Sequence, residues 1–145
     1  MESIKLNSGM VNLEVYCDDI KEVISFNPDD VRFVNSFYQL FDSFKSEEQQ
    51  YKGKMLVLEK DKTIDEYGVP KNMRKRLELI TEYAHLINRK IDSVFGAGTS
   101  EKVFHGAIVP DMYRQFFEGV APYISKSREE KMGKYLDVES DEVMS

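Results

Sequence analysis

Between Met73 and Val94 the apolar residues are separated alternately by four and three positions, which is the spacing of a heptad repeat. This spacing predicts a long helix that buries one narrow stripe against another helix. That other helix can belong to the same chain or to a second copy, and the spacing leaves both possibilities open. The stripe consists of Met73, Leu77, Ile80, Ala84, Ile87, Ile91 and Val94.

An earlier helix is predicted to begin at Pro28, because Asn27 can cap it and proline suits the first helical position. Its inward stripe consists of Phe33, Phe37, Leu40 and Phe44. After Phe44 the pattern thins, and residues 45–70 form a long, mostly polar connection that can be helix or loop. Three apolar residues can extend the stripe past a glycine at position 53: Tyr51, Met55 and Leu58.

The N-terminal residues alternate between apolar and polar, which predicts a β-hairpin. Its strands are residues 4–10 and 11–16, with a turn at Ser8 and Gly9, and residues 22–26 are a candidate third strand. Two or three strands are not stable alone, and we therefore expect their apolar face to pack on the helices. The predicted fold class is therefore mostly α (α+β): a helical bundle with a long heptad-patterned helix and a small N-terminal β-hairpin.

A glycine-punctuated motif follows the heptad helix, and it consists of Phe95, Gly96, Gly98, Thr99, Phe104 and Gly106. Gly96 suits the position just past a helix end, where a left-handed backbone is often needed. Thr99 is predicted to cap a short helix, which Phe104 anchors in the core and Gly106 ends. The motif is therefore interpreted as structural.

A further helix is predicted from Pro110, with four residues facing inward: Met112, Phe116, Phe117 and Val120. Gly119 and Pro122 are predicted to break it, and residues 123–136 to form a last, more polar helix. The whole is expected to be one domain of residues 1–136, with a hairpin region at 1–26 and a helical bundle at 27–136. Residues 137–145 carry four acids and no base, and we expect an acidic flexible tail.

Composition excludes several classes of protein. The net charge of −6 disfavours extensive nucleic-acid binding, and no apolar run is long enough to predict a membrane span. The single cysteine, Cys17, cannot form an internal disulfide and fits a reducing compartment. We therefore expect a soluble, intracellular protein without a nucleic-acid or membrane partner.

No catalytic, cofactor-binding or metal-binding site is predicted. The segment from Gly96 to Thr99 invites comparison with phosphate-binding loops, but it lacks the Gly-Lys-Ser/Thr ending, and Glu101 stands where a third glycine is needed. The two histidines, His85 and His105, have no neighbouring cluster of metal-ligating residues in the sequence. The chain is therefore predicted not to be an enzyme.

Four cations open the heptad helix: Lys71, Arg74, Lys75 and Arg76. They lie at the positive end of the helix dipole, and they form either a solvated patch or a docking surface for an acidic partner. The acidic residues 137–145, from the same chain or a neighbouring copy, can supply such a partner. Tyr113 and Tyr123 are further candidates for an interaction surface, with core packing as the alternative.

Residues 94–106 resemble a sequence motif found in small proteins of the tail-gene cassettes of phages and prophages of Gram-positive bacteria. In that motif a long helix ends in Phe-Gly-x-Gly-Thr and a short helix ends in Phe-x-Gly. The group resembles the tail assembly chaperones, α-helical proteins with a β-hairpin. The resemblance implies a non-enzymatic protein in the host-cell cytoplasm that forms homo-oligomers or binds tape-measure or tail-tube proteins. Two alternatives stay open: a structural virion component or connector, and a small regulatory protein that binds a ligand at Gly96–Thr99.

Overall fold

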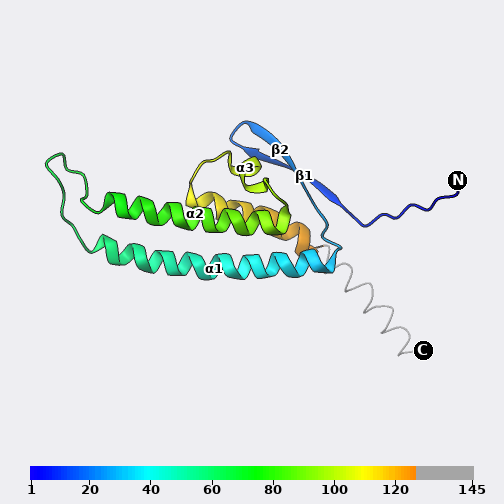
Figure 1. The fold of residues 1–145 in the computed structure, drawn as a ribbon, viewed down its shortest axis with the longest axis horizontal. Helices are drawn as coiled ribbons and strands as arrows, with labels where there is room; N and C mark the ends of the chain where they lie inside the picture. Colours follow the sequence, from blue (N-terminus) through cyan, green and yellow to red (C-terminus); the bar gives the residue numbers. More distant parts are fainter. Residues whose placement is uncertain (127–145) are drawn as a thin grey trace, which may run out of the picture.

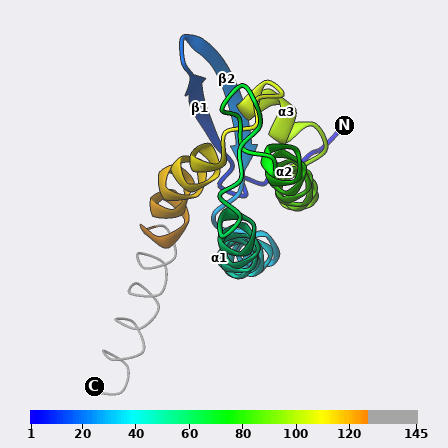
Figure 2. The same cartoon turned by 90° about the vertical axis from the view of Figure 1, so that its left-hand side faces the viewer.

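Two long antiparallel helices, α1 (Val31–Glu59) and α2 (Met73–Phe95), form the frame of the molecule in the computed structural model (Figure 1). The structure describes residues 1–126. A third long helix, here called the C-terminal helix, begins at residue 110 and is described as far as residue 126. The hairpin and the short helix α3 (Thr99–Phe104) lie on the side of α2 that faces away from α1 (Figure 2). The predicted fold class, mostly helical with a small N-terminal hairpin, is confirmed.

The hairpin lies later in the chain than predicted, because its strands are β1 (Val11–Cys17) and β2 (Ile20–Phe26). The predicted third strand is thus part of β2, whereas residues 4–10 belong to no strand. The turn is made at Asp18, whose φ is 53°, and not at Gly9. In the observed register Leu13 lies opposite Ile24, so both strands bury their apolar positions on the same face. Residues 4–10 find no such surface and stay exposed.

The start of α1 differs from the prediction by a few residues. Asp30 caps the helix, and its Oδ1 atom accepts a hydrogen bond from the Arg32 amide at 3.0 Å. Asn27 instead closes a local turn, accepting from the Asp29 amide at 2.9 Å. An Asx turn and a helix cap use the same side-chain chemistry, so the presence of Asn27 alone did not fix the residue at which the helix begins.

Residues 45–70, whose sequence is compatible with either helix or loop, are helical as far as Glu59. The helix passes through Gly53 without a break, and three partly buried side chains extend its inward stripe as predicted: Tyr51, Met55 and Leu58. The loop after α1 is ordered by its own hydrogen bonds. Asp65 accepts through Oδ1 from the amides of Tyr67 at 2.8 Å and Val69 at 3.0 Å.

The heptad stripe of α2 is buried along only part of its length. Ala84, Ile87 and Ile91 are fully buried, whereas Leu77 is 54% exposed. A straight helix rotates a heptad stripe by about 20° per repeat, so the stripe holds its direction only where it supercoils around a partner. In the first half of α2 the stripe turns outward, and Tyr83, which was not predicted, is buried in its place.

The C-terminal helix begins at Pro110, as predicted, and buries Phe116, Phe117 and Val120. The predicted break at Gly119 and Pro122 is wrong, because the helix continues through both to the end of the described residues. Proline inside a helix costs about 3 kcal/mol, and burial of a large aliphatic side chain offsets much of that. The burying residue is Ile124, which is 0% exposed. The predicted domain end at 136, the last helix of residues 123–136 beyond residue 126, and the acidic tail lie outside the described residues.

One aromatic core joins the hairpin, α1, α2, α3 and the C-terminal helix within residues 1–126. Its tightest ring contacts include Phe44 with Phe117, whose centroids are 4.7 Å apart, and Phe33 with Phe95, at 5.4 Å. The core lies toward the α1 N-terminus. Toward the opposite end α1 and α2 continue as a two-helix pair, which the C-terminal helix does not reach (Figure 1).

Candidate partner-binding groove

The glycine motif links α2 to the C-terminal helix through α3. Gly96 and Gly98 have φ values of 116° and 84°, a region that side chains disfavour, so glycine is needed at both. Thr99 is the first residue of α3 and not its cap, which corrects the prediction. Its hydroxyl donates backward to the Gly96 carbonyl at 2.8 Å.

The cap of α3 comes from Asp92 on α2, which the sequence reasoning missed. Its Oδ1 atom accepts from the Ser100 amide at 2.7 Å, and its Oδ2 atom accepts from the Ser100 hydroxyl at 3.1 Å. This carboxylate thus binds the start of α3 from a neighbouring helix. No spacing rule in the sequence indicated it, because Asp92 lies inside a predicted helix and eight residues before its partner.

The aromatic members of the motif pack as predicted. Phe104 is 3% exposed, and its ring centroid lies 4.8 Å from that of Tyr113. Phe95 is partly buried and packs edge-on against Phe26 of the hairpin at 5.9 Å. Gly106, with a φ of 76°, follows the end of α3. The structure therefore places all six motif residues in a connection between helices.

The predicted interaction residues are one ion-paired residue, four exposed residues and one buried residue, Tyr113. Arg76 forms an ion pair with Glu59 at 3.4 Å, which ties the start of α2 to the end of α1. Lys71, Arg74 and Lys75 are exposed, and Tyr123 is 47% exposed on the C-terminal helix.

Tyr113 does not belong to a surface, so that part of the prediction is wrong. It is 1% exposed, and its hydroxyl donates to the Asn88 Oδ1 atom at 2.7 Å and to the Ala84 carbonyl at 3.2 Å. Both partners lie on α2, and a buried tyrosine is retained in a core when its hydroxyl finds such partners. Burial also raises the pKa of Tyr113 to about 12.

A groove of about 390 Å³ opens where α1 and α2 run past the start of the C-terminal helix. Pro110 and Asp111, the first residues of that helix, line the groove together with residues of α1 and α2. The sequence reasoning did not identify this groove, because it depends on where a third helix begins. The side chains that line it are Glu48, Tyr51, Lys52, Met55, Leu79, Ile80, Tyr83, Pro110, Asp111 and Arg114.

The floor of the groove is apolar and aromatic. The Tyr51 and Tyr83 rings lie 5.1 Å apart, and Tyr83 stands edge-on to the core residue Tyr113 at 6.0 Å. Burial raises the pKa of Tyr83 well above its usual value, and the neighbouring Glu48 adds to this effect. The floor therefore offers aromatic rings and methylene groups to an occupant.

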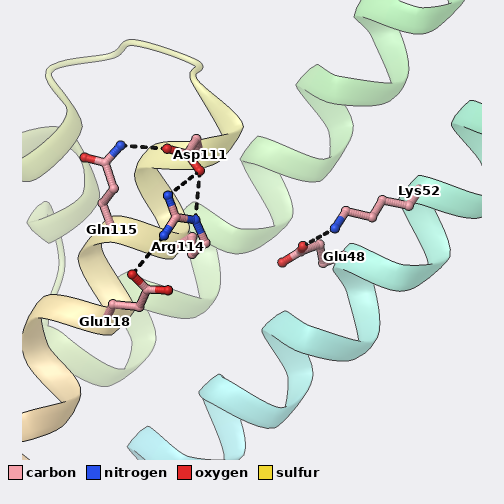
Figure 3. Close-up of polar contacts among 6 residues, drawn as sticks. All are labelled: Glu48, Lys52, Asp111, Arg114, Gln115 and Glu118. Carbon is pink, nitrogen blue, oxygen red and sulfur yellow. Dashed lines mark hydrogen bonds and ion pairs between the residues drawn. The ribbon is translucent and has the colours of Figure 1, made fainter.

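The charged residues of the rim are paired with each other (Figure 3). Lys52 binds Glu48 at 2.6 Å on α1. On the C-terminal helix Arg114 contacts Asp111 at 2.8 Å and Glu118 at 2.9 Å. Hydrogen bonds from Gln115 and Arg114 lower the pKa of Asp111. An apolar floor between locally neutralised rims is typical of a groove that binds an amphipathic helix.

Residues 1–126 contain neither a candidate metal site nor a candidate membrane-spanning helix. No group of three or more His, Cys, Asp or Glu residues in this part of the chain is arranged to hold a metal ion. Among the same residues, no helix combines the length and the apolar character that crossing a bilayer requires.

The fold and groove define a small helical-bundle protein with an N-terminal hairpin. Residues 19–141 match the model of a family of unknown function, DUF6673, and the chain belongs to this family. Searches of the curated proteins and of the solved structures gave no significant match.

Proposed function

We propose that this protein is a non-enzymatic tail assembly protein of a phage or prophage, a chaperone whose groove binds a helical segment of its partner. The observation that carries the proposal is the apolar groove beyond Pro110. A hollow of about 390 Å³ with a neutral aromatic floor suits side chains from one face of a helix. The resemblance at residues 94–106 supplies the tail-assembly context.

In this proposal the partner helix lies along the part of α1 and α2 that the C-terminal helix leaves uncovered. Near the α1 N-terminus the C-terminal helix packs beside α1 and α2 as a third helix. From Pro110 toward the α1–α2 loop, residues 1–126 supply no third helix beside this pair. A partner helix in that position continues the line of the C-terminal helix. The free stretch of α1, residues 48–59, is about 18 Å long, which is about three helical turns. Such a helix would present apolar side chains at spacings of three and four to Met55 and Leu79.

The partners that fit this proposal are the tape-measure protein and the tail-tube protein, as the resemblance implies. Long helical partners contain many amphipathic segments, so several copies of the chaperone can bind along one of them. Self-association into a homo-oligomer belongs to the same proposal, as does a location in the host-cell cytoplasm. Nucleic acid is not among the proposed partners, because the chain has a net charge of −6.

Co-expression with the tape-measure protein and the tail-tube protein of the same phage or prophage tests the proposal. We expect one of them to co-purify with the wild-type chain. Met55→Glu places a charge in the groove and should weaken this binding at least tenfold. Leu56→Glu is the matched control, since Leu56 is 63% exposed and does not line the groove. A chain that stays monomeric and retains neither partner contradicts the proposal, as does equal binding by both variants.

A structural virion component or connector is the second candidate function. Mass spectrometry of purified particles separates the two, because an assembly chaperone should be absent from the finished virion and a component should be present in fixed amount.

The ligand-binding alternative at Gly96–Thr99 meets a physical obstacle, because Asp92 already accepts from the Ser100 amide at the start of α3. An anion there would have to displace this carboxylate. A thermal-shift screen with nucleotides should therefore show no rise in Tm, and a clear rise would favour this alternative.

A further inference from the structure

The end of the molecule that carries the α1–α2 loop has a surface charge opposite to that of the chain as a whole. Residues 60–76 contain six basic and three acidic residues, while the chain has a net charge of −6. We call this region the tip surface. Arg76 is paired with Glu59, whereas the other cations of the tip surface form no ion pair within residues 1–126. These cations are Lys60, Lys62, Lys71, Arg74 and Lys75.

Two of the acids in the tip surface accept hydrogen bonds within the loop itself. Asp61 accepts hydrogen bonds from the amide and hydroxyl of Thr63, at 3.0 and 2.7 Å, and these bonds lower its pKa. Lys71 and Lys75 also lie close enough for their charges to lower the pKa of Asp61. Asp65 accepts from two amides of its own turn. The Lys71 amide donates to the Thr63 carbonyl at 3.0 Å, which closes the base of the loop. The cations are therefore presented on an ordered loop and on the first turn of α2.

Apolar side chains stand among these cations. Tyr67 is 83% exposed, Ile64 is 58% exposed and Val69 is 45% exposed. Solvated charge alone does not explain three large apolar side chains in one loop. Together with the cations they suit a peptide segment that is both acidic and apolar.

The chain itself contains such a segment. Residues 137–145 include four acids, Asp137, Glu139, Asp141 and Glu142, and no base. The same segment contains three apolar residues, Val138, Val143 and Met144. From this complementarity of charge and apolar character, we propose that the tip surface binds residues 137–145 of a second copy of the chain.

A second copy fits better than the same chain because of distance. The C-terminal helix ends its described part beside the start of α1, where the Tyr38 hydroxyl and the Ser125 hydroxyl are 3.1 Å apart. From Tyr38 to the end of α1 is about 30 Å at 1.5 Å per residue. Residue 137 is eleven positions beyond residue 126, and full extension of that stretch covers about 36 Å. Within one chain the first acid of the segment, residue 137, therefore reaches the tip surface only with nearly complete extension of the preceding stretch, a restriction that does not apply between copies.

The two binding surfaces of this contact are different, so each copy can offer a tip surface to one neighbour and an acidic segment to another. Such a head-to-tail contact builds a ring or an open chain of copies. This inference rests on the homo-oligomer of the proposed function and names the surface that would form it. Because the contact leaves the groove free, the inference does not depend on a partner in the groove.

Sedimentation equilibrium of the full chain tests the inference at about 50 mM and about 500 mM NaCl, where screening differs strongly. We expect self-association that weakens at least tenfold at the higher salt concentration. Charge reversal of the tip, Arg74→Glu with Lys75→Glu, should weaken it about tenfold, and so should Asp141→Lys with Glu142→Lys. An equimolar mixture of these two variants should associate again, because each reversed surface then meets its complement.

The matched control is Lys5→Glu with Arg32→Glu, which changes the net charge equally at exposed positions outside the tip surface. This control should associate like the wild type. A wild-type chain that stays monomeric at all concentrations overturns the inference, as do two reversed variants that fail to associate when mixed. Binding of the monomeric wild type to vesicles of anionic lipid would assign the tip surface to a membrane instead. Met55→Glu should self-associate normally, which separates this test from that of the groove.

Discussion

The two ends of the α1–α2 pair are built from similar sequence but have different surroundings. At the core end the stripe of α2 is covered by α1 and the C-terminal helix, and Ile87 is 0% exposed. At the tip end the same stripe has no third helix above it, and Leu77 is 54% exposed. The fully buried heptad positions, Ala84, Ile87 and Ile91, thus lie where a third element covers the helix pair, and the stripe turns outward where no element of residues 1–126 does.

This difference assigns stability and binding to separate parts of the molecule. Aromatic contacts from α1, α2 and the C-terminal helix concentrate at the core end, as in the pairs of Phe117 with Phe37 and Phe44. The groove and the tip surface both lie on the part of α1 and α2 that the C-terminal helix leaves uncovered. Substitutions at the two ends should therefore affect different measurements.

The largest contrast is expected between two aromatic residues. Phe104→Ala should lower the free energy of unfolding by about 3–5 kcal/mol, because the ring is buried and its loss leaves a cavity. Tyr67→Ala at the tip should change it by less than about 0.5 kcal/mol, since that side chain is 83% exposed. Urea unfolding followed by circular dichroism measures both. Similar losses in the two variants would show that the tip contributes to the core.

A closer contrast uses two positions of one stripe on one helix. Ile87→Ala should cost about 2–5 kcal/mol, whereas Leu77→Ala should cost less than about 0.5 kcal/mol. Helix propensity favours alanine at both sites, so the difference reports burial. A large loss at Leu77 would indicate that the exposed half of the stripe is covered by another copy, and this loss would then depend on protein concentration.

The prediction from sequence was most successful where local pattern and burial coincide. The long helices, the start at Pro110 and the burial of Phe104 follow from apolar spacing and local end signals. The error in the hairpin has a different origin. Ile4 and Leu6 alternate with polar residues as β1 does, but β1 pairs with β2 and the two strands pack on α2 and α3, whereas residues 4–10 find neither kind of partner within residues 1–126.

The candidate site was less predictable for the same reason. The groove depends on Pro110 lying beside the middle of α1, which is a relation between distant elements. The cap of α3 by Asp92 spans two helices, and the hydroxyl of Tyr113 finds its partners on α2. The spacing of residues along the sequence gives no indication of such contacts. The cluster of basic residues at the start of α2, in contrast, can be read directly from the sequence.

An alkaline titration sharpens the comparison at the core end. Burial raises the pKa of Tyr113 to about 12, above about 10 in an unfolded chain. The stability that this shift contributes is complete below pH 10 and is lost as the pH rises toward 12, because only the unfolded chain releases the proton in that range. Tyr113→Phe should lose about 1–2 kcal/mol at pH 7 and show a shallower decline above pH 10. Urea midpoints between pH 8 and 11.5 measure both effects, and parallel curves would contradict the assignment.

The smallest expected effect concerns the cap of α3, which lies beside the core. Asp92→Ala should cost about 1 kcal/mol or somewhat more, because it leaves the Ser100 amide unpaired at a residue that is 7% exposed. Thr99→Ala should cost less, since its hydroxyl only supplements the Gly96 carbonyl. Asp92→Asn retains an acceptor and should recover most of the loss. If Thr99→Ala proves the more damaging change, the short helix is capped locally and does not depend on α2. A larger loss of unfolding free energy in Asp92→Ala than in Thr99→Ala would indicate that α3 belongs to the same cooperative unit as the core end.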